Sequence, residues 1–301
     1  MTEKFEIIKS IKKLKKEKKA IILSHVYQIG DVQDIADYTG DSLGLSRKAA
    51  STEGDVIVFC GVQFMAETAH ILNPTKTVLL PDKTADCGLA DMITVEELIT
   101  WKKKYPNAAV VSYVNSSAAI KAESDICCTS ANAIDVVNSC PQNNILFLPD
   151  RNLGSYVAEH TNKNIVLWNG FCYVHEKIQP KQLRQLKKSH PAAEIIVHPE
   201  CTQEVRHMSN FIGSTSQMLQ YVTHSDQEEF IVGTEDNFIH QLQKKNPNKI
   251  FYPVGSSCIG MNRINLEKIK LSLEQSQYKI RLPKNIQFRA KKALDKMLRT
   301  K

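Results

Sequence analysis

Several features that would assign a chain of 301 residues to a familiar class are absent from this sequence. Its eight cysteines include no pair at CxxC spacing, so the patterns of zinc ribbons and thioredoxin-like redox sites are missing. The close cysteine triplet of radical-SAM enzymes is missing too. No apolar stretch approaches the roughly 18 to 20 residues that cross a bilayer, and no charged and then apolar leader is present. We therefore expect a soluble cytoplasmic protein without a membrane partner.

The composition is that of an ordinary globular protein, because 42% of the residues are hydrophobic and can bury a substantial core. Much of the formal net charge of +7 lies near the two ends of the chain, for example in Lys9 to Lys19. Apolar residues accompany that run at helical spacing, and no aromatic side chains are interleaved with it. We expect a solvated amphipathic helix there and no nucleic-acid partner.

Three cysteines, Cys87, Cys172 and Cys258, are almost equally spaced, and each follows a short apolar run by a few residues. A unit that occurs three times and offers one thiolate per copy to a common centre explains this spacing. Three thiolates are one short of the four that normally hold an iron–sulfur cluster, so a [4Fe–4S] cluster would keep one open iron. We expect that iron to act as a Lewis acid. The other cysteines are interpreted as small buried side chains: Cys60, Cys127, Cys128, Cys140 and Cys201.

One pattern occurs three times between about residue 20 and residue 262. Each copy has an apolar run, a polar segment, a turn rich in small hydroxyl residues, two more apolar runs and one of the three cysteines. Strands that alternate with helical stretches predict parallel sheets with right-handed crossovers. We therefore expect an α/β fold of three similar αβα domains with pseudo-threefold symmetry around a central iron–sulfur cluster. The predicted domains are 1–88 with the closing helices of 262–301, then 89–174, then 175–261. The alternative is a single doubly wound sheet with unremarkable polar loops.

The polar segments after the first runs carry residues suited to proton transfer. They supply His25, Tyr27, Tyr113, Asn115, His198 and Glu200. Histidine and glutamate can exchange protons near neutral pH when their surroundings shift them suitably. Ligand groups collect beyond the carboxyl ends of parallel strands, so these side chains should meet.

The hydroxyl-rich turns should each begin a helix. They contain Ser42, Thr129, Ser130, Ser214 and Thr215. The exposed N–H groups of a helix N-terminus favour phosphate or carboxylate, although capping alone explains one such residue. Three in register indicate a substrate with several negative groups.

These motifs resemble those of the quinolinate synthase (NadA) family, over nearly the whole chain. The matching segments are Gly40–Leu43, Val111–Asn115, Cys128–Ala133, His198–Cys201, Gly213–Thr215 and Cys258–Met261. The resemblance implies condensation of iminoaspartate with dihydroxyacetone phosphate to quinolinate, with loss of phosphate and two waters, in NAD biosynthesis. It also implies functional coupling to L-aspartate oxidase.

Position by position, the resemblance implies Cys87, Cys172 and Cys258 as ligands of one [4Fe–4S] cluster. Around the substrates it implies His25, Ser42, Tyr113, Asn115, Ser130, His198, Glu200, Ser214 and Thr215. Tyr27, Tyr113, His198 and Glu200 are the catalytic candidates. Val26 receives no role, and the chain has no cysteine after Cys258 for the C-terminal redox motif of some relatives.

Two other functions remain open from the residues alone. Another cluster-dependent hydro-lyase could use an open iron in the manner of aconitase. A non-enzymatic iron–sulfur sensor could bind nucleic acid through its basic ends, but it would not need His, Tyr and Glu at equivalent strand ends, and it usually carries a recognisable reading helix.

Overall fold

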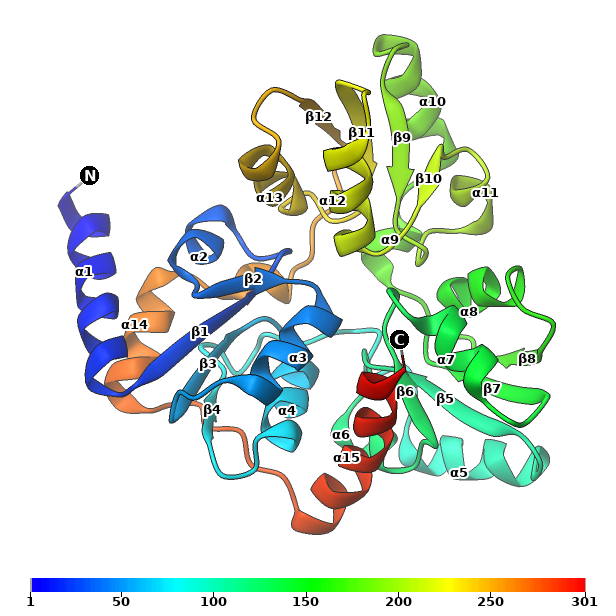
Figure 1. Cartoon of the computed structure of the whole chain (residues 1–301), viewed down its shortest axis with the longest axis horizontal. Coiled ribbons are helices and arrows are strands. Elements are labelled where there is room, and N and C mark those ends of the chain that lie inside the picture. The colour runs from blue at the N-terminus through cyan, green and yellow to red at the C-terminus, as the bar shows by residue number, and fades with distance from the viewer. Residues whose placement is uncertain (1, 301) are drawn as a thin grey trace.

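The computed structural model describes residues 2–300 and contains three four-stranded parallel sheets with flanking helices (Figure 1). Each sheet has the same strand order, in which the second strand of the copy lies at the edge beside the first. In chain order the strands of the first sheet are β1 (Ala20–His25), β2 (Tyr38–Gly40), β3 (Val56–Cys60) and β4 (Thr77–Leu79). Those of the second are β5 (Ala109–Tyr113), β6 (Ile126–Cys128), β7 (Asn144–Leu148) and β8 (Asn164–Leu167). Those of the third are β9 (Glu194–Val197), β10 (Phe211–Ile212), β11 (Glu229–Gly233) and β12 (Ile250–Pro253).

Helices connect the strands and cover both faces of the sheets. The first unit has α1 (Thr2–Glu17), α2 (Gly30–Ile35), α3 (Ser42–Ser51) and α4 (Gln63–Leu72). The second has α5 (Val95–Lys104), α6 (Ala118–Ala122), α7 (Ala133–Ser139) and α8 (Arg151–Ala158). The third has α9 (Tyr173–Glu176), α10 (Pro180–Ser189), α11 (Gln203–Arg206), α12 (Thr215–His224) and α13 (Phe238–Lys245). The chain closes with the 3₁₀ turn η1 (Met261–Arg263), α14 (Leu266–Gln275) and α15 (Lys284–Arg299).

The inner strands are largely continuous apolar runs because both of their faces are buried. In β3, for example, every residue after Val56 is buried, and the same holds for β7 after Asn144. The pattern predicted three αβα units with parallel sheets, and the structure confirms this fold. The short edge strands β2, β6 and β10 lie just before or within the hydroxyl-rich turns.

One hydrogen bond at the amino end of each sheet shows how closely the units repeat. A side-chain oxygen placed just before the edge strand accepts a backbone N–H from the first strand of the copy. The pairs are Asp37 with Ile22, Asp125 with Val110 and Asn210 with Ile195, at 2.8, 2.8 and 2.9 Å. The side chain fixes the register of the edge strand at the amino end of the sheet. The carboxyl ends of the strands therefore remain free to form the site.

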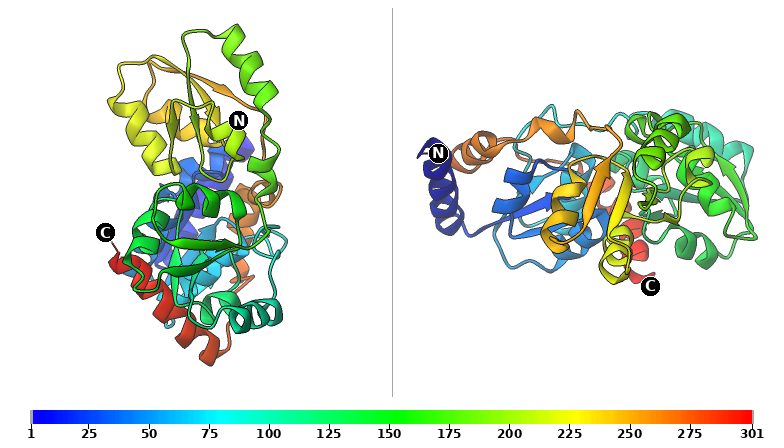
Figure 2. Two further views of the ribbon diagram at one scale, coloured as in Figure 1. Left: turned by 90° about the vertical axis from the view of Figure 1, so that its right-hand side faces the viewer. Right: turned by 90° about the horizontal axis from the view of Figure 1, so that it is seen from above.

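The two closing helices pack on different units. Helix α14 lies against α1 and β3, at one end of the molecule (Figure 2). Helix α15 lies mainly against α6 and β6 of the second unit and also contacts α4 of the first. The predicted assignment of 262–301 to the first unit, like the other domain boundaries, stays a prediction. Among residues 2–300, no helix is both long and apolar enough to span a bilayer.

Candidate active site

Cys87, Cys172 and Cys258 lie on one cavity, each shortly after the last strand of its sheet. The cavity has a volume of about 630 Å³ when the space at its mouth is included. As whole residues these three cysteines are partly exposed, whereas the other five are buried. Burial raises the pKa of Cys87 to about 12 and that of Cys172 well above its ordinary value, and Glu200 adds to the rise at Cys172. Thiols in such surroundings ionise readily only when they bind a metal cation.

The three cysteine loops contact one another in pairs. Met92, beyond Cys87, accepts an N–H from the Trp168 indole at its carbonyl oxygen, 2.7 Å away. The Tyr173 hydroxyl accepts the Ile259 N–H at 2.7 Å and lies 3.8 Å from Sγ of Cys258. A Cβ on Gly260 would meet the Asp86 carbonyl oxygen at 1.9 Å, so only glycine allows this approach. Contacts between the loops thus hold the three cysteines on one cavity.

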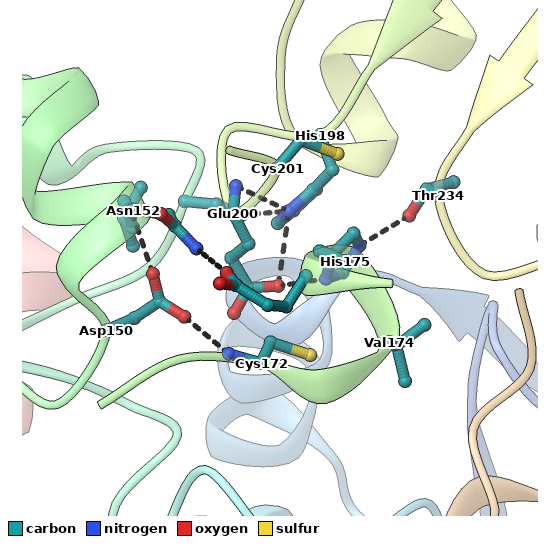
Figure 3. A network of polar contacts seen from close by, with 12 residues as sticks. Asp150, Asn152, Cys172, Val174, His175, His198, Glu200, Cys201 and Thr234 are labelled. Atoms are coloured by element: carbon teal, nitrogen blue, oxygen red, sulfur yellow. Dashed lines mark hydrogen bonds and ion pairs between the residues drawn. The ribbon is translucent and has the colours of Figure 1, made fainter. Parts of the chain in front are cut away.

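A buried cluster around Glu200 forms the polar wall of the cavity (Figure 3). One Glu200 carboxylate oxygen lies 2.9 Å from Nδ1 of His175 and 3.2 Å from Nδ1 of His198. The two imidazole rings stack with their centroids 4.6 Å apart. Burial opposes ionisation of Glu200, but the two histidines outweigh it and hold its pKa well below its ordinary value. Burial lowers the pKa of His198.

A chain of polar contacts joins this cluster to Tyr27. Nε2 of His175 lies 2.9 Å from the Thr234 hydroxyl, and that hydroxyl lies 2.6 Å from the Tyr27 hydroxyl. Burial raises the pKa of Tyr27 well above its usual range, so the phenol keeps its proton. The groups therefore run in sequence from a phenol through a hydroxyl and an imidazole to the carboxylate of Glu200.

The remaining aromatic candidates are also neutral acids or bases. Burial lowers the pKa of His25 to about 3, with a further contribution from His198, and its Nδ1 accepts the Tyr27 N–H at 3.2 Å. Burial likewise raises the pKa of Tyr113 well above its usual value. Among residues 2–300, neither Oδ1 of Asn115 nor Oε1 of Glu200 has a hydrogen-bond partner, although both atoms are buried. Both are available to a bound molecule.

The residues of the hydroxyl-rich turns differ in whether they line the cavity or cap a helix. Ser42 and Thr215 are the first residues of α3 and α12, and Ser130 lies 3.1 Å from Nε2 of His198; all three line the cavity. Ser214 caps α12 by accepting the Gln217 N–H, and it is absent from the cavity lining. Helix α3 is capped by Asp41, whose carboxylate also accepts a hydrogen bond from Ser216 at 2.6 Å.

The charge of the cavity is unusual for a site that would take anions. No lysine or arginine among residues 2–300 lines it, and Asp41 and Glu200 do. The groups in the cavity lining that could meet a negative group are backbone N–H groups, hydroxyls and imidazoles.

The sequence prediction missed His175 and Thr234. His175 lies three residues after Cys172, so a search for a histidine at short spacing from each candidate ligand would have found it. Thr234 directly follows β11, at a strand end that the prediction did not survey. The other predicted residues, Ser214 excepted, line the same cavity: His25, Tyr27, Ser42, Tyr113, Asn115, Ser130, His198, Glu200 and Thr215.

A second arrangement of possible ligand atoms overlaps the first. One atom each from Cys172, His175 and Glu200 lie within 4.8 Å of one another, which is close enough to share a metal ion. Cys172 belongs to both sets of possible ligands. Thiols, imidazoles, phenols and a carboxylate at the strand ends of three parallel sheets define an α/β enzyme with its active site between repeated units.

Comparison with known proteins identifies the family. The family model described as "Quinolinate synthetase A protein" matches residues 9–299. Quinolinate synthase 2 of Methanosarcina acetivorans is 51% identical over 294 residues, which cover 97% of this chain and 95% of the relative. Quinolinate synthase of Dehalococcoides mccartyi is 50% identical over 291 residues, covering 96% of each. The chain belongs to the quinolinate synthetase A family.

Proposed function

We propose that this chain is a quinolinate synthase, which condenses iminoaspartate with dihydroxyacetone phosphate to quinolinate and releases phosphate and two waters. The proposal rests above all on one observation, the presence of one partly exposed cysteine from each of three repeated units on a single cavity. It is supported by the family and by the names of relatives about half identical to this chain. The reaction would serve NAD biosynthesis in the cytoplasm, coupled to an L-aspartate oxidase that supplies the iminoaspartate.

The residues present fit an iron–sulfur cluster, which the family implies. Cys87, Cys172 and Cys258 would hold it, because their thiols share the cavity and the surroundings disfavour bare thiolates. A set of three cysteines provides no fourth protein thiolate. When bound, a [4Fe–4S] cluster supplies a Lewis acid at the iron without a cysteine.

Substrate binding falls to neutral donors. Helices α3 and α12 each have ten residues, and their N-terminal N–H groups bind the phosphate and carboxylate groups of the two substrates. Ser42, Thr215 and Ser130 add hydroxyl donors beside them. The free Oδ1 of Asn115 accepts an N–H or O–H of a substrate. His25, neutral at physiological pH because burial lowers its pKa, adds an imidazole without charge.

Proton transfer falls to the buried network. Ionised Glu200 accepts a proton from a substrate carbon or nitrogen through its free Oε1. His175 and Thr234 link that carboxylate to Tyr27, which keeps its phenolic proton and can donate it. Tyr113 is a second phenolic donor, and His198 fixes Glu200 from the other side. These roles suit the tautomerisation and ring closure that the product requires.

One assay tests the function directly. Anaerobically reconstituted protein with its full content of iron and sulfide is given iminoaspartate and dihydroxyacetone phosphate, and quinolinate is measured by chromatography. We expect quinolinate in amounts that exceed the protein many times over. Cluster-loaded protein that forms no quinolinate would show that the proposal is wrong, and dehydration of a hydroxy acid by the same protein would favour a hydro-lyase.

A further inference from the structure

The same backbone bridge ties each cysteine loop to the third strand of its unit. In each unit, the residue three positions after the end of the third strand donates its N–H to a backbone carbonyl oxygen. That carbonyl belongs to the residue two positions before the cysteine. The pairs are Gln63 with Ala85, Arg151 with Gly170 and Asp236 with Ser256, at 2.9, 2.8 and 2.8 Å. The bridge therefore identifies equivalent positions in the three units without reference to side chains.

The position just before each bridge residue differs between the units. It is Asp150 in the second unit and Glu235 in the third, and both carboxylates are fully buried. Strand pairing confirms the equivalence, because Leu148 pairs with Ser112 and Gly233 pairs with Val197, two residues before each carboxylate.

Each of these carboxylates accepts the backbone N–H of the cysteine in its own unit. Oδ2 of Asp150 accepts the Cys172 N–H at 2.9 Å (Figure 3). Oε1 of Glu235 accepts the Cys258 N–H at 3.1 Å. The second oxygen of Asp150 accepts the Leu153 N–H at 2.7 Å and so caps α8, while that of Glu235 accepts the Asn237 N–H at 2.8 Å. Each carboxylate thus joins a cysteine to the start of the following helix.

The first unit lacks this device. Val62 occupies the equivalent position, has no side-chain acceptor for the cysteine N–H, and lines the cavity instead. The Cys87 N–H is bound by the side chain of the adjacent Asp86 at 2.8 Å, and Asp86 is exposed to solvent. The backbone of Cys87 is therefore fixed by its own exposed loop rather than by a buried group of the sheet.

We propose that Asp150 and Glu235 are positioning residues that hold Cys172 and Cys258 in the orientation that binds the iron–sulfur cluster, and that Cys87 is the least restrained of the three ligands. This inference rests on the cluster assignment made in the proposed function. Partners of this kind orient metal ligands in many proteins, and their loss typically weakens metal binding about 10- to 100-fold. Without the two carboxylates, the backbone N–H groups of Cys172 and Cys258 would have no acceptor, and each cysteine would be free to reorient.

The test separates ligand positioning from helix capping. In Asp150→Ser a side-chain oxygen remains that caps α8, since serine is a good N-cap, but the second acceptor for Cys172 is lost. The control is Asp125→Ser, which removes a carboxylate that accepts the Val110 N–H at the other end of the same sheet. The rate of cluster loss to an iron chelator is followed by visible absorption in anaerobically reconstituted protein.

We expect Asp150→Ser to lose the cluster about ten times faster or more, with changed visible circular dichroism, and Asp125→Ser to match the wild type. Glu235→Gln leaves one acceptor oxygen for three N–H groups and should accelerate the loss several-fold, so it decides the question if Asp150→Ser does not fold. Equal rates in all the proteins would overturn the inference, while quinolinate synthesis by the wild type would still stand.

A measurement without the cluster keeps the two proposals apart. In cluster-free protein, alkylation of Cys172 and Cys87 is compared by mass spectrometry. We expect Asp150→Ser to speed alkylation of Cys172 several-fold relative to Cys87. An unchanged ratio of the two alkylation rates would count against the positioning role, and this holds whether or not the wild type takes up a cluster. Failure of the wild type to take up a cluster would contradict the proposed function instead.

Discussion

The Glu200 carboxylate lies 2.9 Å from Nδ1 of His175, and both side chains are almost wholly buried. The two residues lie in different segments of the third unit, His175 in α9 and Glu200 in the loop after β9, so the pair forms only when these segments pack together. A buried carboxylate needs such a partner, because an isolated charge in the interior is very costly. The same contact holds the pKa of Glu200 below its ordinary value, so the carboxylate stays ionised in a cavity that no lysine or arginine of residues 2–300 lines.

Glu200→Gln should abolish most of the activity while leaving the cluster in place. The amide keeps the size of the side chain but cannot accept a proton, and loss of a general base typically costs about 10² to 10⁴ in kcat. Steady-state formation of quinolinate measures the effect, and iron analysis checks the loading. Glu204→Gln changes an exposed glutamate nearby and should leave the rate unchanged. Activity of Glu200→Gln within a few-fold of the wild type would contradict the role of Glu200 as a base.

Thr234→Val should uncouple Tyr27 from His175. Valine has nearly the shape of threonine but no hydroxyl, so both partners lose a hydrogen bond at 2.6 and 2.9 Å. Leaving buried polar groups unsatisfied costs about 1–3 kcal/mol in stability. We expect kcat to fall about 10²-fold or more, because a positioned proton-transfer group typically contributes at least this much.

The control for this change is Thr223→Val, which removes an exposed threonine hydroxyl that bonds only within α12. Thermal unfolding and kcat are measured for both variants. If Thr234→Val lost stability and kept its full kcat, the contact would be structural and Tyr27 would need another route for its proton.

The fold was predictable because it depends on local patterns that occur three times. Apolar runs of three or four residues predicted the buried strands. Equal spacing predicted that Cys87, Cys172 and Cys258 belong to equivalent loops. The residues that link units were not predictable in this way. His175 meets Glu200 only because α9 packs against the loop after β9, and Thr234 meets Tyr27 only because the third unit docks on the first. No periodicity in the chain encodes either arrangement. Ser214 looked like its neighbours in sequence, yet its hydroxyl caps α12.

Serine substitutions test which cysteines bind iron. Cys87→Ser, Cys172→Ser and Cys258→Ser should each abolish the visible absorption of the reconstituted cluster, because each removes one of three thiolates. Cys60→Ser should leave the absorption intact, since Cys60 is buried at the end of β3 and lies outside the cavity lining. Equal loss in all four variants would discredit the ligand assignment. Retention in Cys87→Ser alone would favour the overlapping site of Cys172, His175 and Glu200.

Lys121 provides a pH-dependent prediction outside the cavity. Its side chain is fully buried, donates to the Ser116 carbonyl oxygen, and lies 5.2 Å from the centre of the Phe64 ring. No carboxylate among residues 2–300 forms an ion pair with it. Burial lowers the pKa of Lys121 to about 8, and Cys127, Glu67 and Cys87 offset this only in part. The folded protein therefore releases this proton at a lower pH than the unfolded chain does.

The sign of the effect follows from proton linkage. Below pH 8 both states hold the proton, and folding bears the full cost of burying an ammonium group. Above pH 8 the unfolded chain holds more protons at this site, so the stability of the wild type rises relative to a variant without the amine. Lys121→Met is that variant. Between pH 7.5 and 9.5, the wild type should gain about 2 kcal/mol relative to Lys121→Met in urea unfolding of the cluster-free protein.

Comparing the two proteins at each pH cancels the titration of the cysteines, which both contain. Lys104→Met provides the matched control, because Lys104 is exposed at the end of α5 and its removal should leave no pH-dependent difference. A constant difference between wild type and Lys121→Met over this range would mean that the buried amine keeps its proton throughout. In that case the Ser116 carbonyl and the Phe64 ring would stabilise the ammonium group as well as water does.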